Sequence, residues 1–519
     1  MRKTILILML LWVTIPVMSQ FYNGLQMAFG KNRVQYGQFM WQYYRFPRFD
    51  TYYYSNGKEL AQYTAQVAEK KIKELENLLG YTLEKRIIFL VYNNLSDFRQ
   101  SNIGLISGND NYNIGGVTRI IDNKVFLYFE SDHVNFEKQI NAAIAEVIVN
   151  EMLYGSDLKT KVANNTLMSL PEWYLKGLIS YLAYEWDPEI DNIVREGILT
   201  GRYEKFNRLM GQDAVYAGHS IWYFIAEKYG KKVIPNIIYL TRVSKNSESG
   251  FLYVLGLPVK YLTFEWLNFY DLRYYEDDKK RSFPENKKQM VKPRRYRVYD
   301  QFTTSPDGRY FAWCTNQSGR YKIFLHDTET GKNKRIFKGG EKIEQINDYS
   351  YPLIVWHPTG KLLTFVNEQK GSTWLWFYDM ETHTLDNKEM FNTQKILSYS
   401  FNARGNLLAM SALKEGQTDI YIYNNNANTY ESVTSDLADD RNPVFCCDNR
   451  SILFASNRRS DTLRGDTTFP GLSTRYNVFL YTPGAGAFTQ ITDEPLSDFT
   501  NPYEIRNQEY LILSNRNGI

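Results

Sequence analysis

Cysteine and histidine are both scarce in this 519-residue chain, which contains three cysteines and five histidines. Three cysteines make a poor disulfide framework. Two of them, Cys446 and Cys447, are adjacent, so in a strand they would point to opposite faces. Cys314 could meet one of the pair across the fold, but we expect buried free thiols. No Cys/His spacing suggests a metal site.

A large excess of either charge and long apolar runs are also lacking. The 61 basic and 57 acidic residues leave a formal net charge of +4, which gives no electrostatic reason to expect nucleic acid as a partner. After the N-terminal segment, nothing approaches the roughly 20 continuous apolar residues of a membrane helix. The sequence also contains no nucleophile elbow, P-loop or dinucleotide fingerprint, so it offers little other chemistry.

The first 19 residues are typical of an export signal. Arg2 and Lys3 precede an apolar run over residues 5–15, and Val17 and Ser19 provide the small-residue positions before a cleavage site. We therefore expect residues 1–19 to be a signal peptide and the protein to be exported, either periplasmic or associated with the outer membrane. An uncleaved membrane anchor is the alternative.

Aromatic residues, in contrast, are abundant: 41 Tyr and 30 Phe bring the aromatic content to 16%, and such side chains favour strands. The 43% hydrophobic and 23% charged residues are ordinary for a globular protein. The length indicates two or three domains. We expect an α+β domain over residues 20–275, a charged linker over 276–299 and an all-β domain over 300–519.

Residues 20–275 mix helical and strand patterns, which makes this domain α+β. Pro171 stands where proline favours a helix start, and two helices are expected on either side of Gly230. Apolar spacing and β-rich runs predict the remaining elements: a helix over 57–81, a strand over 86–92, a hairpin over 115–130, and helices over 135–154 and 170–184.

From residue 300 onwards the chain repeats itself. Each unit opens with a polar turn, continues as an apolar strand and adds a second strand, as in "SPDGRYFAW" followed by "YKIFLHD". Fixed-period β units of this length are the mark of a propeller, and a β-sandwich is the alternative. The units begin at Ser305, His357, Asn402, Cys447 and Ile505.

These repeats resemble those of TolB-like, WD40-like (PD40) β-propellers, and the resemblance covers residues 300–519. About four units are complete and the fifth lacks its outer strands, so the propeller is incomplete in this chain. Because closure removes exposed strand edges, we expect a natural C-terminal part to be missing. A long loop over residues 457–477 is expected on a propeller face, where loops can bind partners.

The segment "LPEWYLKGLISYL", residues 170–182, and the helix before it resemble the peptidase MA-like, or gluzincin-like, metallopeptidases. The resemblance implies two zinc-binding histidines around a general-base glutamate on one helix, and a third, acidic ligand on the next. Here Ala145 and Val149 occupy the histidine positions around Glu146, and Lys176 occupies the third position.

A second register places Asn150 and Tyr154 around Glu151, and it also supplies no imidazole. Zinc needs three or four nitrogen, sulfur or oxygen donors, so we expect a degenerate site with no metal, no cofactor and no catalytic residue. In its place we expect a structural ion pair between Glu146 and Lys176, with Glu151 as the other acidic candidate.

Other candidate ligands are isolated in the sequence. His133 is expected in a loop before the predicted helix over residues 135–154, and His219 at the start of a later helix. The stretch "GNDNYNIGG", residues 108–116, invites a calcium-loop interpretation, but it lacks the regular Asp spacing and the closing Glu of such loops. We therefore expect a glycine-rich turn there.

The sequence as a whole predicts a non-catalytic protein-binding or scaffold protein of the cell envelope, and the resemblance suggests a Bacteroidetes-type protein. Its partners would be envelope proteins, to which tyrosine-rich faces are suited. The alternative is a divergent secreted hydrolase acting on peptide or glycan, with an unrecognised site or a catalytic domain beyond residue 519. A third possibility is a small ligand in the propeller channel.

Overall fold

A computed structural model of the chain describes most of residues 37–516. The predicted signal peptide, the glycine-rich stretch 108–116 and most of the loop 457–477 lie outside the described residues. Within the described part, none of the helices has the length and apolarity needed to cross a membrane. The residues not described are 1–36, 102–118, 122, 157–167, 280–290, 295, 342–348, 370, 392, 460–474, 486, 495–496, 507 and 517–519.

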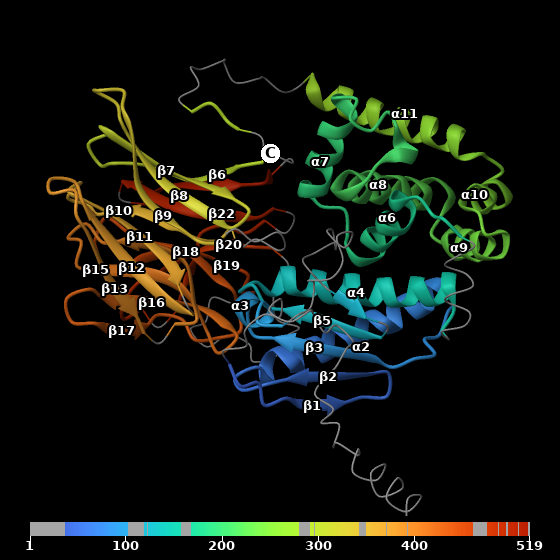
Figure 1. Cartoon of the computed structure of the whole chain (residues 1–519), viewed down its shortest axis with the longest axis horizontal. Helices are drawn as coiled ribbons and strands as arrows, with labels where there is room; N and C mark the ends of the chain where they lie inside the picture. The colour runs from blue at the N-terminus through green and yellow to red at the C-terminus, as the bar shows by residue number, and fades with distance from the viewer. Residues whose placement is uncertain are drawn as a thin grey trace, which may run out of the picture.

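The chain folds into two parts that lie side by side (Figure 1). The first contains a five-stranded sheet and a set of helices that ends at Asp278. The second contains only strands and begins at Val298. A helical N-terminal region followed by a β-propeller is thus the architecture of this protein.

The five-stranded sheet has the order β1-β2-β3-β5-β4. The three central strands are parallel, and β1 and β4 pair antiparallel at the two edges. The predicted hairpin is present as β4 and β5, whereas β1 and β2 were not predicted. The strand bounds are β1 (Gln42–Arg45), β2 (Phe49–Tyr53), β3 (Ile87–Tyr92), β4 (Arg119–Ile121) and β5 (Lys124–Tyr128).

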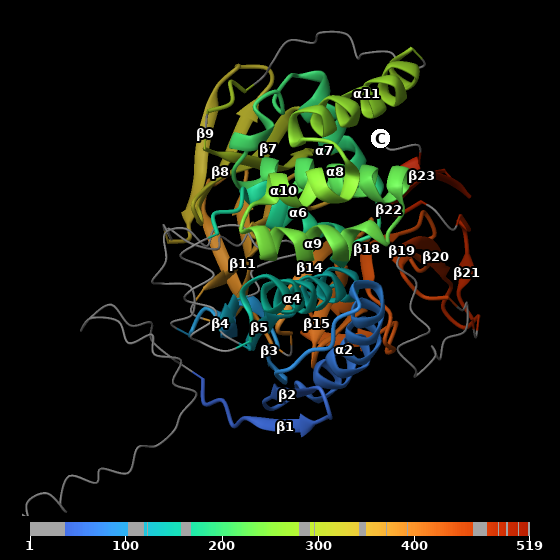
Figure 2. The same ribbon diagram turned by 90° about the vertical axis from the view of Figure 1, so that its right-hand side faces the viewer.

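Helices α2 (Lys58–Leu79) and α4 (His133–Tyr154) lie on the sheet. Figure 2 shows α4 between this layer and the helices above it, and α6 and α9 pack on its far side. A helix packed between two layers is apolar over most of its circumference, and α4 is rich in buried Ala, Ile and Val. The central position of α4 therefore accounts for its aliphatic sequence.

Helices α6 to α11 stack above α4, whereas the short α3 lies beside β3 and β5 (Figure 1). Helices α6 and α8 cross at two glycines, because a Cβ at Gly177 would lie 2.3 Å from the Cα of Gly218. Such a close approach of two backbones needs residues without side chains. The bounds are α3 (Leu95–Phe98), α6 (Glu172–Ala183), α7 (Pro188–Leu199), α8 (Gly211–Tyr229), α9 (Val233–Ser244), α10 (Ser247–Leu255) and α11 (Val259–Asp278).

The C-terminal part is a β-propeller with four four-stranded antiparallel sheets, followed by a two-stranded sheet. Neighbouring sheets bury their apolar faces against each other. The first two blades are β6 (Val298–Thr304), β7 (Tyr310–Gln317), β8 (Arg320–Asp327) and β9 (Asn333–Gly339), then β10 (Leu353–Trp356), β11 (Leu362–Gln369), β12 (Ser372–Asp379) and β13 (Leu385–Met390).

The later sheets follow the same up-and-down order. The third blade is β14 (Lys395–Phe401), β15 (Leu407–Lys414), β16 (Gln417–Asn424) and β17 (Thr429–Ser432). The fourth is β18 (Asp440–Phe445), β19 (Ile452–Ser456), β20 (Asn477–Tyr481) and β21 (Thr489–Gln490). The two-stranded sheet is β22 (Phe499–Arg506) and β23 (Glu509–Ser514).

The two parts are joined by a buried polar network at the N-terminus of α4. The carboxylate of Asp439, from the propeller, accepts a hydrogen bond from the backbone N–H of His133, and the His133 Nδ1 lies 2.8 Å from its other oxygen. Asp132, the N-cap of α4, pairs with Arg441 at 2.8 Å and accepts a hydrogen bond from the hydroxyl of Tyr476. An anionic group at a helix N-terminus is electrostatically favourable, so this contact fixes the propeller to α4.

Candidate functional site

The positions expected to be degenerate metal ligands lie in the core. Ala145 and Val149 are 0% exposed and belong to the main apolar cluster of the helical part. Glu146 lies between them on α4 and is half-buried. In the alternative register Asn150 and Tyr154 are half-buried too. Since alkyl side chains offer no lone pair to a metal, this stretch of α4 serves packing.

Lys176 pairs within its own helix. Its Nζ lies 2.8 Å from the carboxylate of Glu172, one turn earlier on α6, and Glu172 also accepts a hydrogen bond from the backbone N–H of Gly211. Although burial raises it, these hydrogen bonds hold the pKa of Glu172 below its ordinary value. Lys176 therefore forms an ion pair with Glu172, because residues four apart on a helix are neighbours, and the expected pair with Glu146 stays a prediction.

Glu151 has a structural role at the end of α4. Its carboxylate accepts hydrogen bonds from the hydroxyl of Tyr81 at 3.4 Å and from the backbone N–H of Glu84 at 3.2 Å. Burial, reinforced by this carboxylate, raises the pKa of Tyr81 to about 12. Glu151 thereby connects α4 to the segment between α2 and β3, and its carboxylate is already occupied.

The two histidines of the helical part lie in different places from those expected. His133 is the first residue of α4, where it is buried against Asp439, and not a loop residue. His219 lies in the middle of α8, fully buried, with its Nδ1 2.9 Å from the hydroxyl of Ser180. Burial lowers the pKa of His219 to about 4, so its imidazole is neutral.

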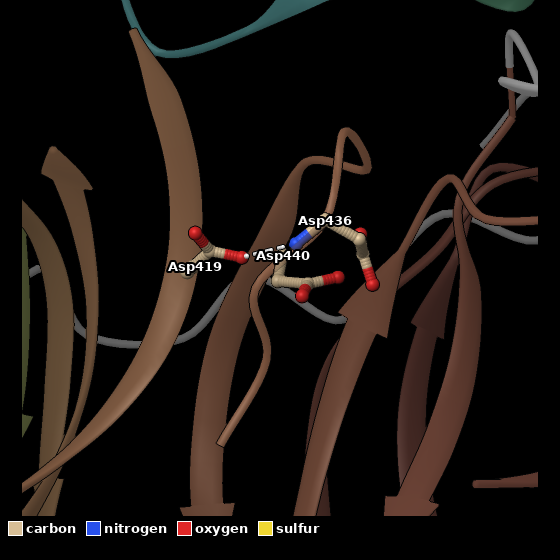
Figure 3. Close-up of side chains that lie close together, drawn as sticks. All are labelled: Asp419, Asp436 and Asp440. Atoms are coloured by element: carbon tan, nitrogen blue, oxygen red, sulfur yellow. Dashed lines mark hydrogen bonds between the residues drawn. The ribbon is translucent and has the colours of Figure 1, made fainter. Parts of the chain in front are cut away.

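One cluster of possible metal ligands occurs among the described residues, and it lies in the propeller. Asp419 lies on β16, Asp440 lies at the start of β18, and Asp436 lies in the segment just before β18. Their carboxylates lie within 4.8 Å of one another (Figure 3). The guanidinium of Arg458 lies 3.1 Å from Asp436 and 2.7 Å from Asp440. A cation that belongs to the chain therefore already pairs with two of the three carboxylates.

A proton removes part of the remaining negative charge of this cluster. Burial and the neighbouring carboxylates raise the pKa of Asp419 to about 8. Arg458 is also enclosed by aromatic rings, with its Cζ 4.3 Å from the centre of Phe488. With Asp419 protonated, the guanidinium leaves a single negative charge on the cluster, and both ionised carboxylates already pair with Arg458, so we interpret the cluster as structural. No sequence motif predicted this cluster, because its residues come from separate turns and strands.

A cavity of about 800 Å³ lies between the helical part and the propeller. One wall consists of α2 and the first half of α4, and another of the connection between α6 and α7. The propeller closes it with residues near β20, β22 and the end of the described chain. Asp132 and Tyr476 belong both to this lining and to the network that joins the two parts. We call this hollow the interdomain cleft.

Aromatic rings and carboxylates dominate the cleft wall between α6 and α7. Trp186 packs on Tyr223 of α8 with ring centres 4.8 Å apart. Burial, with a contribution from Glu227, raises the pKa of Tyr181 to about 12. These phenols therefore stay protonated at neutral pH and can donate hydrogen bonds. No recognised motif marks this wall in the sequence, although "YEWDPE", residues 184–189, alternates aromatic and acidic side chains.

Several solved structures are similar to part of this chain. No family model and no curated protein matches the sequence. Among solved structures, TolB from Acinetobacter baumannii is 16% identical over 43% of this chain and 53% of that chain, with a TM-score of 0.31. The β-propeller domain of the Trilobed protease from Pyrococcus furiosus is 16% identical over 39% of this chain and 60% of that chain, with a TM-score of 0.26.

A prolyl endopeptidase structure is 13% identical, covering 40% of this chain and 31% of that chain, with a TM-score of 0.28. This chain thus spans about half the length of the TolB structure that it matches. At such identities the similarity concerns the propeller fold alone. The gluzincin-like identity of the helical part stays a prediction from the sequence.

Proposed function

We propose that this protein is a non-catalytic binding protein of the cell envelope. In this proposal its helical part descends from a metallopeptidase and has lost the metal site, and it presents a binding surface together with the propeller. The observation that carries the proposal is the complete burial of Ala145 and Val149, which stand where two zinc-binding imidazoles would be.

Coordination chemistry supports the absence of zinc catalysis at this place. A catalytic zinc needs three protein ligands and an open position for water. The two helix positions supply methyl groups only, and Lys176 adds a cation that repels a metal and already pairs with Glu172. We therefore expect no zinc binding at this place, and not merely a weaker affinity, because the ligands themselves are missing.

The interdomain cleft supports a binding role. Its walls come from both parts of the chain, and the buried contacts among Asp132, Asp439 and Arg441 hold those parts together. A preformed cleft loses little entropy on binding. We place this activity in the periplasm or at the outer membrane, in agreement with the export signal predicted for residues 1–19.

The test is a hydrolysis assay on the purified chain. Unfolded casein is incubated with the protein, with and without 1,10-phenanthroline, and peptide release is measured. We expect no release above that of a heat-inactivated sample. Chelator-sensitive release that disappears in the variant Glu146→Gln would overturn the proposal. Release that Glu146→Gln leaves unchanged would identify a contaminating peptidase or a site elsewhere, and a repeat with Glu151→Gln would then examine the second register.

A further inference from the structure

We infer that the interdomain cleft binds an extended polypeptide segment that carries lysine or arginine side chains, an inference that rests on the proposed binding function and specifies its partner. The cleft is lined by eight carboxylates but only five cationic side chains. A surplus of one charge inside a concave site attracts ligands of the opposite charge. Some of these charges are already neutralised by ion pairs within the protein.

Three carboxylates of the lining pair with cations of the lining. Their partners lie at ion-pair distance, so these six side chains contribute almost no net charge to the cleft. The pairs are Glu74 with Lys71 at 3.0 Å, Asp187 with Lys138 at 3.3 Å, and Asp498 with Arg475 at 3.0 Å. A fourth carboxylate, Asp132, pairs with Arg441 of the propeller.

Four carboxylates of the lining have no salt bridge within the part of the chain that the structure describes. Glu137 accepts a hydrogen bond from Tyr63, which does not neutralise it, and Glu185, Glu189 and Glu227 are exposed. The positive charges of the lining that oppose these four carboxylates are those of two exposed lysines, Lys70 and Lys231. The cleft is therefore acidic on balance, which favours a cationic ligand and disfavours phosphate-bearing or acidic ones.

The aromatic side chains favour the same kind of ligand. A cation within about 6 Å of a ring centre is attracted by the face of the ring. The wall already shows this contact twice: Lys138 Nζ lies 5.7 Å from the centre of Tyr184, and Arg273 Cζ lies 6.0 Å from that of Trp186. Tyr181 and Trp186 are half-buried, so parts of their rings remain available to a ligand.

The hydrogen-bonding groups of the wall suit a main chain. Asn141 Oδ1 and the hydroxyl of Tyr184 are buried atoms without a hydrogen-bond partner. Such atoms cost roughly 1–3 kcal/mol each when left unsatisfied. An extended peptide brings alternating N–H and C=O groups, which are the donor and the acceptor that these two atoms lack.

The dimensions of the cleft indicate a short segment as its occupant. A volume of about 800 Å³ lies within the range of pockets that enclose drug-sized ligands. It accommodates a few extended residues but not a folded domain. A protein partner would therefore insert a loop or a tail with basic side chains, while its folded part stays outside.

The experiment uses fluorescence anisotropy with the full chain and a labelled eight-residue peptide of alternating Lys and Ser. We expect it to bind at least about tenfold more tightly than the matching Glu and Ser peptide at 50 mM NaCl. Its affinity should fall at 300 mM NaCl, because salt screens exposed charges. A neutral hexasaccharide serves as the third ligand, since sugars also stack on aromatic rings.

Variants assign the binding to the cleft. Glu185→Gln and Glu227→Gln should each weaken the lysine peptide about two- to fivefold, as expected for partly exposed charge pairs. Glu431→Gln, which removes an exposed carboxylate from β17, is the matched control and should leave the affinity unchanged. Circular dichroism of each variant shows that the fold is retained.

Three results would overturn the inference: no binding of the lysine peptide, equal binding of the acidic peptide, or binding that both cleft variants leave unchanged. Binding of the hexasaccharide in place of the peptide would make the cleft a glycan site and also contradict it. Mass spectrometry of the recovered peptide separates the two proposals. A cleaved peptide contradicts the non-catalytic function, whereas an intact peptide that never bound contradicts only this inference.

Discussion

At the scale of single residues, the most unusual group is the buried cluster of Asp419, Asp436, Asp440 and Arg458. Three carboxylates lie away from water beside one guanidinium, which pairs with Asp436 and Asp440. Burial is the main reason why the pKa values of Asp419 and Asp440 rise, to about 8 and about 6. Removing a charge from water without full compensation is costly. Protonation of Asp419 is therefore the means by which the folded protein tolerates the cluster.

This protonation makes stability depend on pH. The pKa of Asp419 in the folded chain, about 8, lies above its value of roughly 3.9 in an unfolded chain. Between these values the folded state holds a proton that the unfolded state has released, so stability falls as pH rises from about 4 to about 8. Above pH 8 both states are ionised and the loss is complete.

The variant Asp419→Asn tests this directly, because asparagine keeps the oxygen that accepts hydrogen bonds from Thr434 and from the backbone of Asp436. The free energy of unfolding of the variant, relative to that of the unmodified protein, should increase by at least about 2 kcal/mol from pH 5 to pH 9, since one pKa unit corresponds to about 1.4 kcal/mol. Urea unfolding at the two pH values measures it. Asp386→Asn, at an exposed position of β13, controls for the loss of one charge, and an equal pH dependence of Asp419→Asn and the unmodified chain would contradict the assignment.

At the scale of secondary-structure elements, the crossing of α6 and α8 brings two helix backbones into direct contact. A Cβ at Gly218 would lie 2.2 Å from the backbone oxygen of Trp173, and neither helix can move away because both are buried on several sides. Overpacking of a core typically costs 1–3 kcal/mol and sometimes more. A backbone atom cannot rotate aside, so the cost here should lie at the upper end.

We therefore expect Gly218→Ala to lower the free energy of unfolding by about 3 kcal/mol, measured by chemical denaturation. Gly80→Ala is the control: Gly80 ends α2 with a positive φ of 60° and has open space around its Cα. That substitution should cost only about 1 kcal/mol, from the backbone conformation alone. Equal losses in both variants would show that the helices do not cross as tightly as the structure indicates.

Elements were also what the sequence predicted best. Periodicity placed α2, α4, α6 and the propeller strands, because long amphipathic or alternating patterns reflect burial directly. It missed β1 and β2, which are short, as well as α7, and it placed His133 in a loop. The partner of that residue, Asp439, lies 306 positions away. Contacts between distant segments leave no local pattern, and for the same reason neither the interdomain cleft nor the carboxylate cluster was foreseen.

At the scale of the whole molecule, the network at the start of α4 joins the two parts. Although burial opposes it, the pairing with Arg441 keeps the pKa of Asp132 below its ordinary value. Asp439 is 0% exposed and accepts hydrogen bonds from His133 and Asn457. Because the interdomain cleft lies directly beside this network, its shape depends on the same contacts.

Removal of Asp439 should therefore loosen the two parts from each other. We expect Asp439→Ala to cost about 3–5 kcal/mol, since removing one partner of a buried charged contact leaves the other unsatisfied. Calorimetry should show one transition for the unmodified chain and two for the variant, because the helical part and the propeller would unfold separately. Asp439→Asn, which keeps an acceptor for the His133 N–H, should be milder. A single unchanged transition in both variants would contradict a coupling role for this network.

The measurement that bears most directly on the central claim is the zinc content of the purified chain. The protein is equilibrated with a small excess of zinc, dialysed, and analysed by mass spectrometry of the metal. With methyl groups at Ala145 and Val149 and a cation at Lys176, we predict less than about 0.1 zinc ion per chain. About one zinc ion per chain, retained on dialysis and removed only by a chelator, would contradict the account.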